Sequence, residues 1–528
     1  MIIRRRDFAG MLGLSVTTLA LGGCVDLAEE TSDSAAAVPR PPDLIPTSLE
    51  MRSWRLLNRF GFGPRPHDIA ALERSGPAAF LECQLHPEQL SEDPHLTQML
   101  ASLSTLELDA DAARDSEGEW KGDDYIIPLF SKLLQFRLPY GDTTPGAVSR
   151  ELQQARLLRA VYSHRQVFES MVEFWTDHFS IDQRKSSCRW LKTVDDRQIR
   201  RHALGKFRDL LAVSMRSPAM LVYLDNADSR RRDPLTGAAP NENYARELLE
   251  LHTLGVDAGY SLSDIQEVAR CLTGWSVQTG LLEFEPGDFV FRDGWHDDQP
   301  KRVLGFAFPE GQAEDDGEEL LNLLAGHPKT AEFISRKLCR RFVADIPPQA
   351  LVDQLTSVFL ATDGDIPSLI RTIVGSDEFV DPENMKLRRP FDFVAAALRA
   401  TNAVTSGVGV LPYLAELGQV PFQWAQPDGY PDQMETWSRG MLPRWNFAID
   451  LLHGRIAETH TDGRALSHMT GRENAAGICR TLARSVTGQQ FPADILSEMS
   501  EWAAGGKAAT AAPQWLALIL SSPQFQWR

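Results

Sequence analysis

The chain has 528 residues, of which 43% are hydrophobic, and its formal net charge is −18. Such an acidic balance argues against binding to a nucleic-acid backbone, which requires a basic surface. The chain is long enough to bury a sizeable core, and it contains no internal run of roughly eighteen apolar residues that would cross a membrane.

Residues 1–23 predict an export signal. Arg5 and Arg6 precede a short uncharged stretch, as in twin-arginine signals, and the stretch ends in LGGC at Cys24, the pattern of a lipoprotein cleavage site. The alternative is an ordinary secretory signal with a chance arginine cluster. We expect an exported protein of the periplasm or cell surface, anchored in the outer membrane by a lipid on Cys24, because Val25 and not Asp follows the cysteine.

Residues 24–48 are rich in Ser, Ala, Pro and acidic residues and predict a disordered tether. Residues 49–528 then predict one helical domain, with a split near 284–316 as the alternative, since that segment suits short strands or a long loop. The five remaining cysteines show no paired spacing, which favours free thiols. The fold class is mainly α: a large multi-helix domain with long irregular loops and at most a few short strands. Apolar residues recur at helical spacing over 150–164, 166–178, 198–215, 241–254, 330–343 and 366–374.

The densest polar segment reads NENYARELLELH. On a helix, four of its side chains share one face: Asn243, Arg246, Glu247 and Glu250. Two carboxylates one turn apart, beside an Arg and an Asn, can bind a metal, position a water or hold a polar substrate. Spacing alone favours the alternative, a helix with ion pairs from Arg246 to Glu242 and Glu250. Because so many charges share one face, we expect this helix to be buried on both sides.

Two histidines are further candidates. His178 ends an aromatic-rich helix, where it is either a ligand or general base, or a core histidine bonded to a backbone carbonyl. His296 and Asp297 are neighbours in an irregular segment and suit metal binding. The predicted ligands of a divalent metal are therefore His178, Glu247, Glu250, His296 and Asp297.

Other motifs are less specific. Arg336, Lys337, Arg340 and Arg341 predict a basic helix face that receives an anion or pairs with the acidic run at 314–319. The sequence contains no GxSxG elbow, Walker A loop, HExxH motif or Rossmann glycine fingerprint, so the common hydrolase, NTPase, zincin and dehydrogenase classes have no local support.

A series of distinctive segments runs along the chain: RLLNRFGFG, FWTDHFS, RRHALGKFRDLL, SPAMLVYLDN, NENYARELLELHTLGVDAGYSLSDIQEVARCLTGW, HPKTAEFISRKLCRRFV, GDIPSLIRTIVGSDEF, PDGYPDQMETWSRGMLPRWNFA and SSPQFQW. In this order they resemble domain-of-unknown-function family 1800. The resemblance implies one long helical domain in exported proteins, without a settled activity. It also implies a neighbouring exported partner of family 1501, which resembles sulfatases. It draws attention to His178 and the segment 241–252, by which the family is identified.

Three functions remain open at this level. The first is an envelope enzyme whose polar pocket combines His178 with the face of Asn243, Arg246, Glu247 and Glu250, with a metal as Lewis acid. The second is a non-catalytic partner or maturation factor of a neighbouring exported enzyme. The third is a polysaccharide-binding lipoprotein that uses Trp275, Trp295, Trp424 and Trp437.

Overall fold

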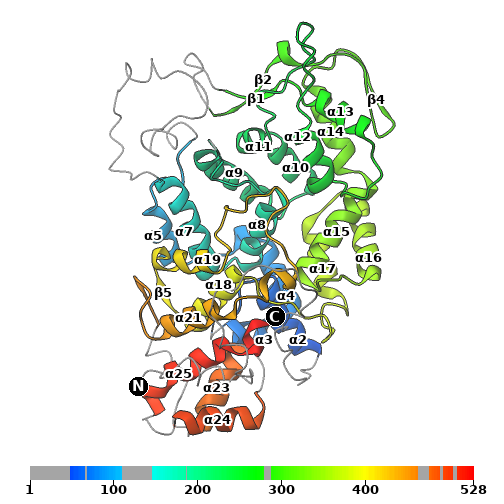
Figure 1. Cartoon of the computed structure of the whole chain (residues 1–528). Coiled ribbons are helices and arrows are strands. Elements are labelled where there is room, and N and C mark those ends of the chain that lie inside the picture. The colour runs from blue at the N-terminus through cyan, green and yellow to red at the C-terminus, as the bar shows by residue number, and fades with distance from the viewer. Residues whose placement is uncertain are drawn as a thin grey trace, which may run out of the picture. The chain divides into compact units, whose positions relative to one another are not determined.

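A computed structural model describes residues 48–65, 68–109, 146–185, 187–278, 287–461, 475–487, 491–503 and 508–528. The export signal, Cys24 and nearly all of the tether lie outside these residues. As predicted, the chain is mainly helical (Figure 1). It divides into two compact units, and the segment at 287–316 lies inside unit 2. Unit 1 comprises Met1–Phe80, Val380–Gly418 and Gln433–Arg528, and unit 2 comprises Leu81–Phe379 and Gln419–Asp432.

Unit 2 holds every candidate residue of the polar segment and both candidate histidines. Its short sheets lie at the same end of the unit as α13 and α14 in Figure 1. Its elements are α4 (Pro77–Leu85, which begins in unit 1), η2 (Pro87–Gln89), α5 (Pro94–Ala101), α7 (Ala147–Tyr162), α8 (Gln166–His178), α9 (Cys188–His202), α10 (Phe207–Met215), α11 (Pro218–Tyr223), α12 (Asn243–Glu247), η3 (Leu248–His252), α13 (Leu262–Cys271), β1 (Trp275–Val277), β2 (Phe289–Phe291), η4 (Asp293–Trp295), β3 (Lys301–Val303), β4 (Phe306–Phe308), α14 (Asp315–Ala325), α15 (Pro328–Phe342), α16 (Gln349–Thr362) and α17 (Ile366–Gly375).

Unit 1 buries the C-terminal residues of the chain among arginines. The Arg388 guanidinium donates to the Phe525 carbonyl and to Asn58, and the Arg444 guanidinium donates to Gln526. Its elements are α2 (Ser48–Arg59), α3 (Asp68–Ser75), α18 (Pro390–Ala400), β5 (Val404–Thr405), η5 (Val408–Val410), α19 (Leu411–Glu416), α20 (Met434–Trp437), α21 (Met441–Leu452), β6 (Thr459–His460), α23 (Ala475–Thr487), α24 (Ala493–Ala503), α25 (Ala508–Ser521) and α26 (Pro523–Gln526).

The sheets of the described chain are three antiparallel pairs, β1–β2, β3–β4 and β5–β6. Trp275 pairs with Phe291 in the first sheet and Lys301 pairs with Phe308 in the second. The irregular segment therefore does contain short strands. A pair of two or three residues per strand is too small to stand alone, so these sheets depend on the helices around them.

Side-chain caps mark the start of several helices. Asp365 accepts the Ser368 N–H and begins α17, as predicted, and Ser217 does the same for α11. The expected helix over 198–215 is two helices, α9 and α10. α9 ends at His202, and after Gly205 the Phe207 N–H bonds to the Gly364 carbonyl. Ser261 and Asp264 form a capping box at the start of α13.

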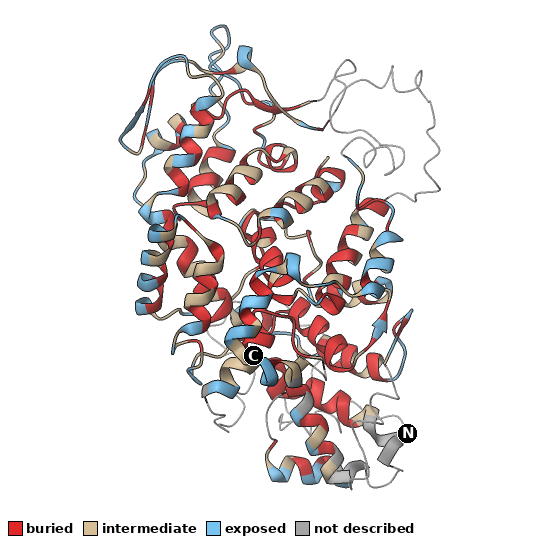
Figure 2. Cartoon of the chain, turned by 180° about the vertical axis from the view of Figure 1, so that it is seen from behind, coloured by how far each residue is buried: buried red, intermediate tan, exposed pale blue. Residues whose placement is uncertain are grey.

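The outer helices show the one-sided burial that apolar spacing predicts, with buried residues on one side and exposed residues on the other (Figure 2). By contrast, α8 is buried on nearly every side and α18 on all sides. Cys188, Cys271, Cys339 and Cys479 are buried free thiols, and Cys83 is exposed. Among the described residues, none of the helices has the length and the apolar character that a membrane crossing requires.

Candidate functional site

The polar segment does not form one regular helix. Asn243–Glu247 is α-helical, whereas Leu248–His252 is a π-helix. The Thr253 hydroxyl donates to the carbonyl of Leu248 at 2.6 Å, which widens the hydrogen-bonded turn. The predicted i, i+7 relation between the first and last polar side chains is therefore broken. Short π-helical turns are frequent at functional sites.

The Arg246 guanidinium forms the two ion pairs of the alternative interpretation. It lies 3.7 Å from Glu242 and 3.4 Å from Glu250, and its side chain is 41% exposed. The expectation that both faces of this helix are buried is wrong. Only the apolar face is buried, because the opposite face keeps its charges in contact with water.

Asn243 is directed away from the carboxylates of this segment. Its amide group donates to the Leu224 carbonyl and to Asp225 at the end of α11. Its own N–H bonds to the side chain of Asn241. Asn243 thus holds the start of α12 in place, and no hydrogen bond connects it with Glu247 or Glu250.

Glu247 is the chemically unusual member of the segment. It is half-buried and makes no hydrogen bond or ion pair with any described residue. Burial, followed by the Glu250 and Asp428 carboxylates, raises its pKa above the usual range, although Arg246 opposes the shift. Glu250 itself bonds Arg246 and Tyr260, and burial together with Glu250 raises the pKa of Tyr260 to about 12. Glu247 is therefore poised to carry a proton closer to neutral pH than an ordinary glutamate.

Asp428 comes from the distant loop at residues 419–432. The Trp424 indole N–H donates to its carboxylate at 2.7 Å, and the rings of Trp424 and Tyr430 lie 5.0 Å apart. Gly429 has a φ of +79°, and a Cβ there would come within 2.0 Å of the Asp177 carbonyl oxygen. Only glycine permits this close approach, which holds Asp428 beside the end of α8.

Lys337 on α15 completes this group of charges. Burial lowers its pKa to about 8, although the Asp432, Asp177 and Asp428 carboxylates oppose the shift. Asp428 therefore acts electrostatically on both Glu247 and Lys337. We call Glu247, Glu250, Asp428 and Lys337 the open cluster. The sequence analysis predicted neither Asp428 nor the separate role of Lys337. The sequence PDG at residues 427–429 could have indicated a tight turn at Asp428, because its glycine adopts a positive φ.

Two other members of the predicted basic face of α15, Arg336 and Arg341, are engaged in ion pairs. Arg341 is buried and lies 2.8 Å from Glu173 and 3.4 Å from Asp432, and Arg336 pairs with Glu332. The acidic run at 314–319 pairs with α10 and its C-terminal residue rather than with α15, through Arg208 and Arg216.

His178 is a core histidine. It is 1% exposed, and its Nε2–H donates to the His252 carbonyl at 3.0 Å, which caps the π-helix. Rings of Phe174, Trp175 and Phe179 surround it. Burial, then Lys337 and His252, hold its pKa well below the usual range. No hydrogen bond or ion pair joins it to Glu247 or Glu250, so the structure does not assemble the predicted pocket around this imidazole.

His252 is the second neutral imidazole of this core. Burial and Lys337 lower its pKa to about 3. Neither of its ring nitrogens has a hydrogen-bond partner among the described residues. The sequence analysis did not select His252, which is the last residue of the polar segment. The residues three and four positions before it are leucines, so helical spacing gives it no charged neighbour on that side.

His296 and Asp297 have separate partners. His296 is fully buried; its Nδ1 lies 2.8 Å from the Thr273 carbonyl and its Nε2 lies 3.0 Å from Asp316. The Lys301 ammonium lies 2.5 Å from the same Asp316 oxygen. We call His296, Lys301 and Asp316 the closed cluster. Asp297 instead pairs with Arg270.

These contacts leave no assembled metal site. In the described ranges, no three His, Cys, Asp or Glu side chains form a group that could hold a metal ion. The five predicted ligands all lie within these ranges, but they are distributed over the aromatic core, the open cluster, the closed cluster and the Arg270 ion pair. The residues therefore do not fit the predicted divalent metal, and no chemical step is assigned to one.

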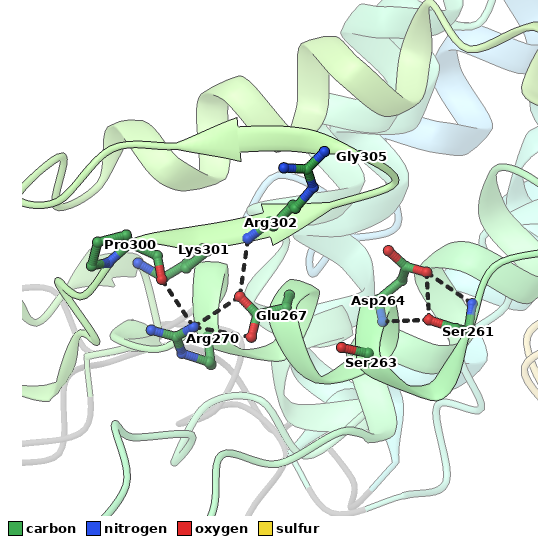
Figure 3. A pocket seen from close by; sticks show the side chains of 9 residues that line it. All are labelled: Ser261, Ser263, Asp264, Glu267, Arg270, Pro300, Lys301, Arg302 and Gly305. Atoms are coloured by element: carbon green, nitrogen blue, oxygen red, sulfur yellow. Dashed lines mark hydrogen bonds and ion pairs between the residues drawn. The ribbon is translucent and has the colours of Figure 1, made fainter.

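Two open pockets flank α13. One has a volume of about 470 Å³ (Figure 3), and the other, of about 490 Å³, includes Arg231, Arg232 and Glu242. Glu267 and Arg270 line both. Figure 3 shows Arg270 bonded to Glu267 and to the Pro300 carbonyl. Glu267 and Arg270, which line both pockets, are thus paired with each other, whereas Glu247 of the open cluster has no such partner.

The four candidate tryptophans do not share one groove. Trp275 is fully buried. The ring of Trp295 faces the Arg230 guanidinium at 3.5 Å and the Arg292 guanidinium at 5.0 Å. Trp437 belongs to unit 1. Only Trp424 lies beside the open cluster, where it offers an aromatic surface to a ligand.

Comparison with known proteins gives one match. The model of the family described as "Protein of unknown function (DUF1800)" matches residues 55–527. No curated protein and no solved structure matches the chain.

Proposed function

This chain belongs to the DUF1800 family of proteins of unknown function, and from that premise we propose that it is an exported enzyme acting on an envelope polysaccharide. Glu247 is the proton donor. One observation carries the proposal: Glu247 and Lys337 have pKa values displaced towards neutrality from opposite sides, and Asp428 acts on both. Opposed pKa shifts in two groups that share a charged neighbour are typical of acid–base catalysts.

The open cluster suits a saccharide for three reasons. A carboxyl with a raised pKa can protonate a leaving glycosidic oxygen, as general acids of glycosidases do. The carboxylates of Glu250 and Asp428 accept hydrogen bonds from hydroxyl groups. Trp424 and Tyr430 form an aromatic pair next to Asp428, and sugar rings stack on such surfaces.

The test combines product analysis with a matched pair of variants. Purified full-length protein is incubated with envelope polysaccharides of its native host, and released fragments are identified by mass spectrometry. Glu247→Gln should lose at least about 100-fold of the rate, as expected for a general acid. Glu242→Gln, on the preceding turn, should keep it. The absence of any product with the parent protein, or equal rates for both variants, would overturn the proposal.

The pH profile adds a second criterion. Because Glu247 must be protonated to donate, the rate should fall as the pH rises through its raised pKa. Glu242→Gln should leave this descending limb where it is. A rate that rises throughout the same pH range would assign the proton donation to another group.

Export and membrane anchoring belong to the same proposal. Their support is the twin-arginine pattern and the LGGC sequence ending at Cys24, both outside the described residues. Cys24→Ala should move the protein from the membrane fraction to the soluble fraction. If the variant stays in the membrane fraction as firmly as the parent, the lipid anchor is wrong.

A second candidate function is that of a non-catalytic partner of a neighbouring exported enzyme, such as the sulfatase-like family 1501. The observation in its favour is that Arg246 is engaged by carboxylates on both sides, as in a rigid structural helix. Under this alternative, Glu247→Gln and parent protein would support the partner's activity equally well, whereas deletion of the whole chain would reduce it.

A further inference from the structure

The closed cluster joins three segments inside unit 2. Lys301 begins β3, Asp316 lies in the first turn of α14, and His296 follows η4. The side chains of Lys301 and Asp316 are both 0% exposed, and so is that of His296. The amine and the imidazole both contact the same carboxylate oxygen, Oδ2, at 2.5 and 3.0 Å.

The surroundings of the carboxyl keep water away. Asp316 Oδ1 is buried without a hydrogen-bond partner. Trp275 packs directly on the next residue: a Cβ on Gly317 would lie 2.0 Å from the indole ring. For the amine to attack, a proton must first pass from the ammonium to the carboxylate, and burial favours this transfer because two neutral groups cost less to desolvate than two charges. The reacting pair is then an amine held against a carboxylic acid.

We propose that Lys301 and Asp316 condense to an amide, which cross-links β3 to α14 covalently. Lys301 Nζ attacks Asp316 Cγ, the new Nζ–Cγ bond forms, and the Cγ–Oδ2 bond breaks. Starting from the amine and the carboxylic acid, Nζ loses one proton, and Oδ2 leaves as water with that proton and the one it already carries. The condensation needs no oxidant, reductant or other co-reactant, and the fold supplies the close approach that replaces an activated ester.

His296 moves the protons in this step. Its Nδ1–H donates to the Thr273 carbonyl, which fixes the ring orientation. Nε2 then faces Oδ2, the oxygen that leaves. Nε2 takes a proton from Nζ as the Nζ–Cγ bond forms and returns it to Oδ2 as the carbon–oxygen bond breaks. The imidazole ends the step with the protons with which it began.

The chain contains its own control, a second buried Lys–Asp pair. Lys192 lies 2.5 Å from Asp195 on α9, with side chains 0% and 3% exposed. The other carboxylate oxygen of Asp195 accepts a hydrogen bond from the Ser217 hydroxyl, and no imidazole is bonded to this carboxylate. Burial and distance are therefore matched, but the proton carrier is missing, so we expect this pair to remain an ion pair.

The test is peptide mass spectrometry on denatured, trypsin-digested full-length protein. The amide blocks cleavage after Lys301, so residues 293–302 should appear joined to residues 303–329, lighter than their sum by one water. Recovery of separate, unmodified peptides 293–301 and 303–329 overturns the proposal. An amide that also appears between Lys192 and Asp195 overturns the role given to His296.

Variants sharpen the assignment. Lys301→Met should give no linked peptide. Asp316→Asn should give the same linked product as the parent, because ammonia leaves in place of water. His296→Gln should lower the linked fraction at least tenfold at matched times after synthesis. A linked fraction unchanged by His296→Gln would contradict the proton route, and a product with Lys301→Met would assign the link to another amine.

Discussion

The open cluster and the closed cluster are built from the same kinds of side chain, but their surroundings differ. Lys301, Asp316 and His296 are out of contact with water and meet at one oxygen. In the open cluster, Glu247 has no partner and Lys337 is half-buried. Full burial with pairing holds the closed cluster in the contact from which we propose its condensation, whereas partial burial without pairing displaces the pKa values of Glu247 and Lys337. Reactive groups in a helical protein can therefore lie in a dry, paired cluster as well as in a half-open, unpaired one.

The largest expected effect comes from breaking the closed cluster. Asp316→Ala prevents the proposed amide and leaves Lys301 and His296 buried without a carboxyl partner, which should cost at least about 3–5 kcal/mol of unfolding free energy. Urea unfolding measures it. The control is Asp225→Ala: its pair with Lys185 is half-exposed and should contribute less than about 1 kcal/mol. Equal losses in the two variants would contradict the distinction between buried and exposed pairs.

The next effect concerns the neutral histidines of the core. The unfolded chain protonates His252 below its usual pKa of 6.5, whereas the folded chain does so only near 3. Stability should therefore fall as the pH drops from about 6.5 to 3, by about 1.4 kcal/mol per pH unit for this group. His252→Leu loses no hydrogen bond of the ring and should flatten this slope.

The control for that prediction is His86→Leu. His86 is half-exposed, with its ring 3.5 Å from Glu88 at the surface. Its removal should leave the acid limb of the stability curve in place. If His252→Leu and the parent show parallel curves between pH 6 and 4, this imidazole is already protonated in the fold.

A smaller effect is expected at Lys337, in the opposite pH range. Its pKa is about 8 in the fold and 10.5 in the unfolded chain. Between these values the unfolded state binds more protons, so the parent should gain stability relative to Lys337→Met as the pH rises from 8 to 10.5. Lys329→Met, at an exposed position of the same helix, is the control. If the stability curves of Lys337→Met and the parent run parallel between pH 8 and 10.5, the pKa of Lys337 is not lowered in the fold. The open cluster would then contain only one group with a displaced pKa, Glu247.

The smallest effect is expected at Arg246. Because its ion pairs are half-exposed, Arg246→Ala should cost less than about 1 kcal/mol. Arg341→Ala is the matched comparison, since Arg341 also meets two carboxylates but is 1% exposed. It should cost about 3–5 kcal/mol. Thermal unfolding of both variants orders them; a larger loss at Arg246 would mean that its pairs are buried in solution.

Local signals in the sequence were sufficient for much of the fold. The apolar spacing of 166–178 predicted α8 with its bounds, and Asp365 predicted the start of α17. The π-helix could not be predicted, because it depends on the Thr253 hydroxyl replacing a backbone partner. The break between α9 and α10 likewise depends on a distant carbonyl, that of Gly364.

The candidate site was predicted only in part. Glu247 and Glu250 were found because they share one short segment, whereas Asp428, which acts on both Glu247 and Lys337, comes from a distant loop. His178 and His296 were identified by residue type, but their partners are a backbone carbonyl and Asp316, which spacing does not reveal. Sequence patterns locate reactive side chains within one element, while their partners are set by tertiary packing.

The loop at 419–432 makes unit 2 discontinuous along the chain. The Gln183 N–H bonds to the Phe422 carbonyl, and the Phe422 ring lies 5.1 Å from the Arg156 guanidinium and 5.7 Å from the Lys192 ammonium. A fragment that stops at residue 379 would lack this loop and leave those cations uncovered. Limited proteolysis or gene truncation would therefore not yield a complete unit 2, but adding residues 419–432 as a separate peptide would offer a way to reconstitute it.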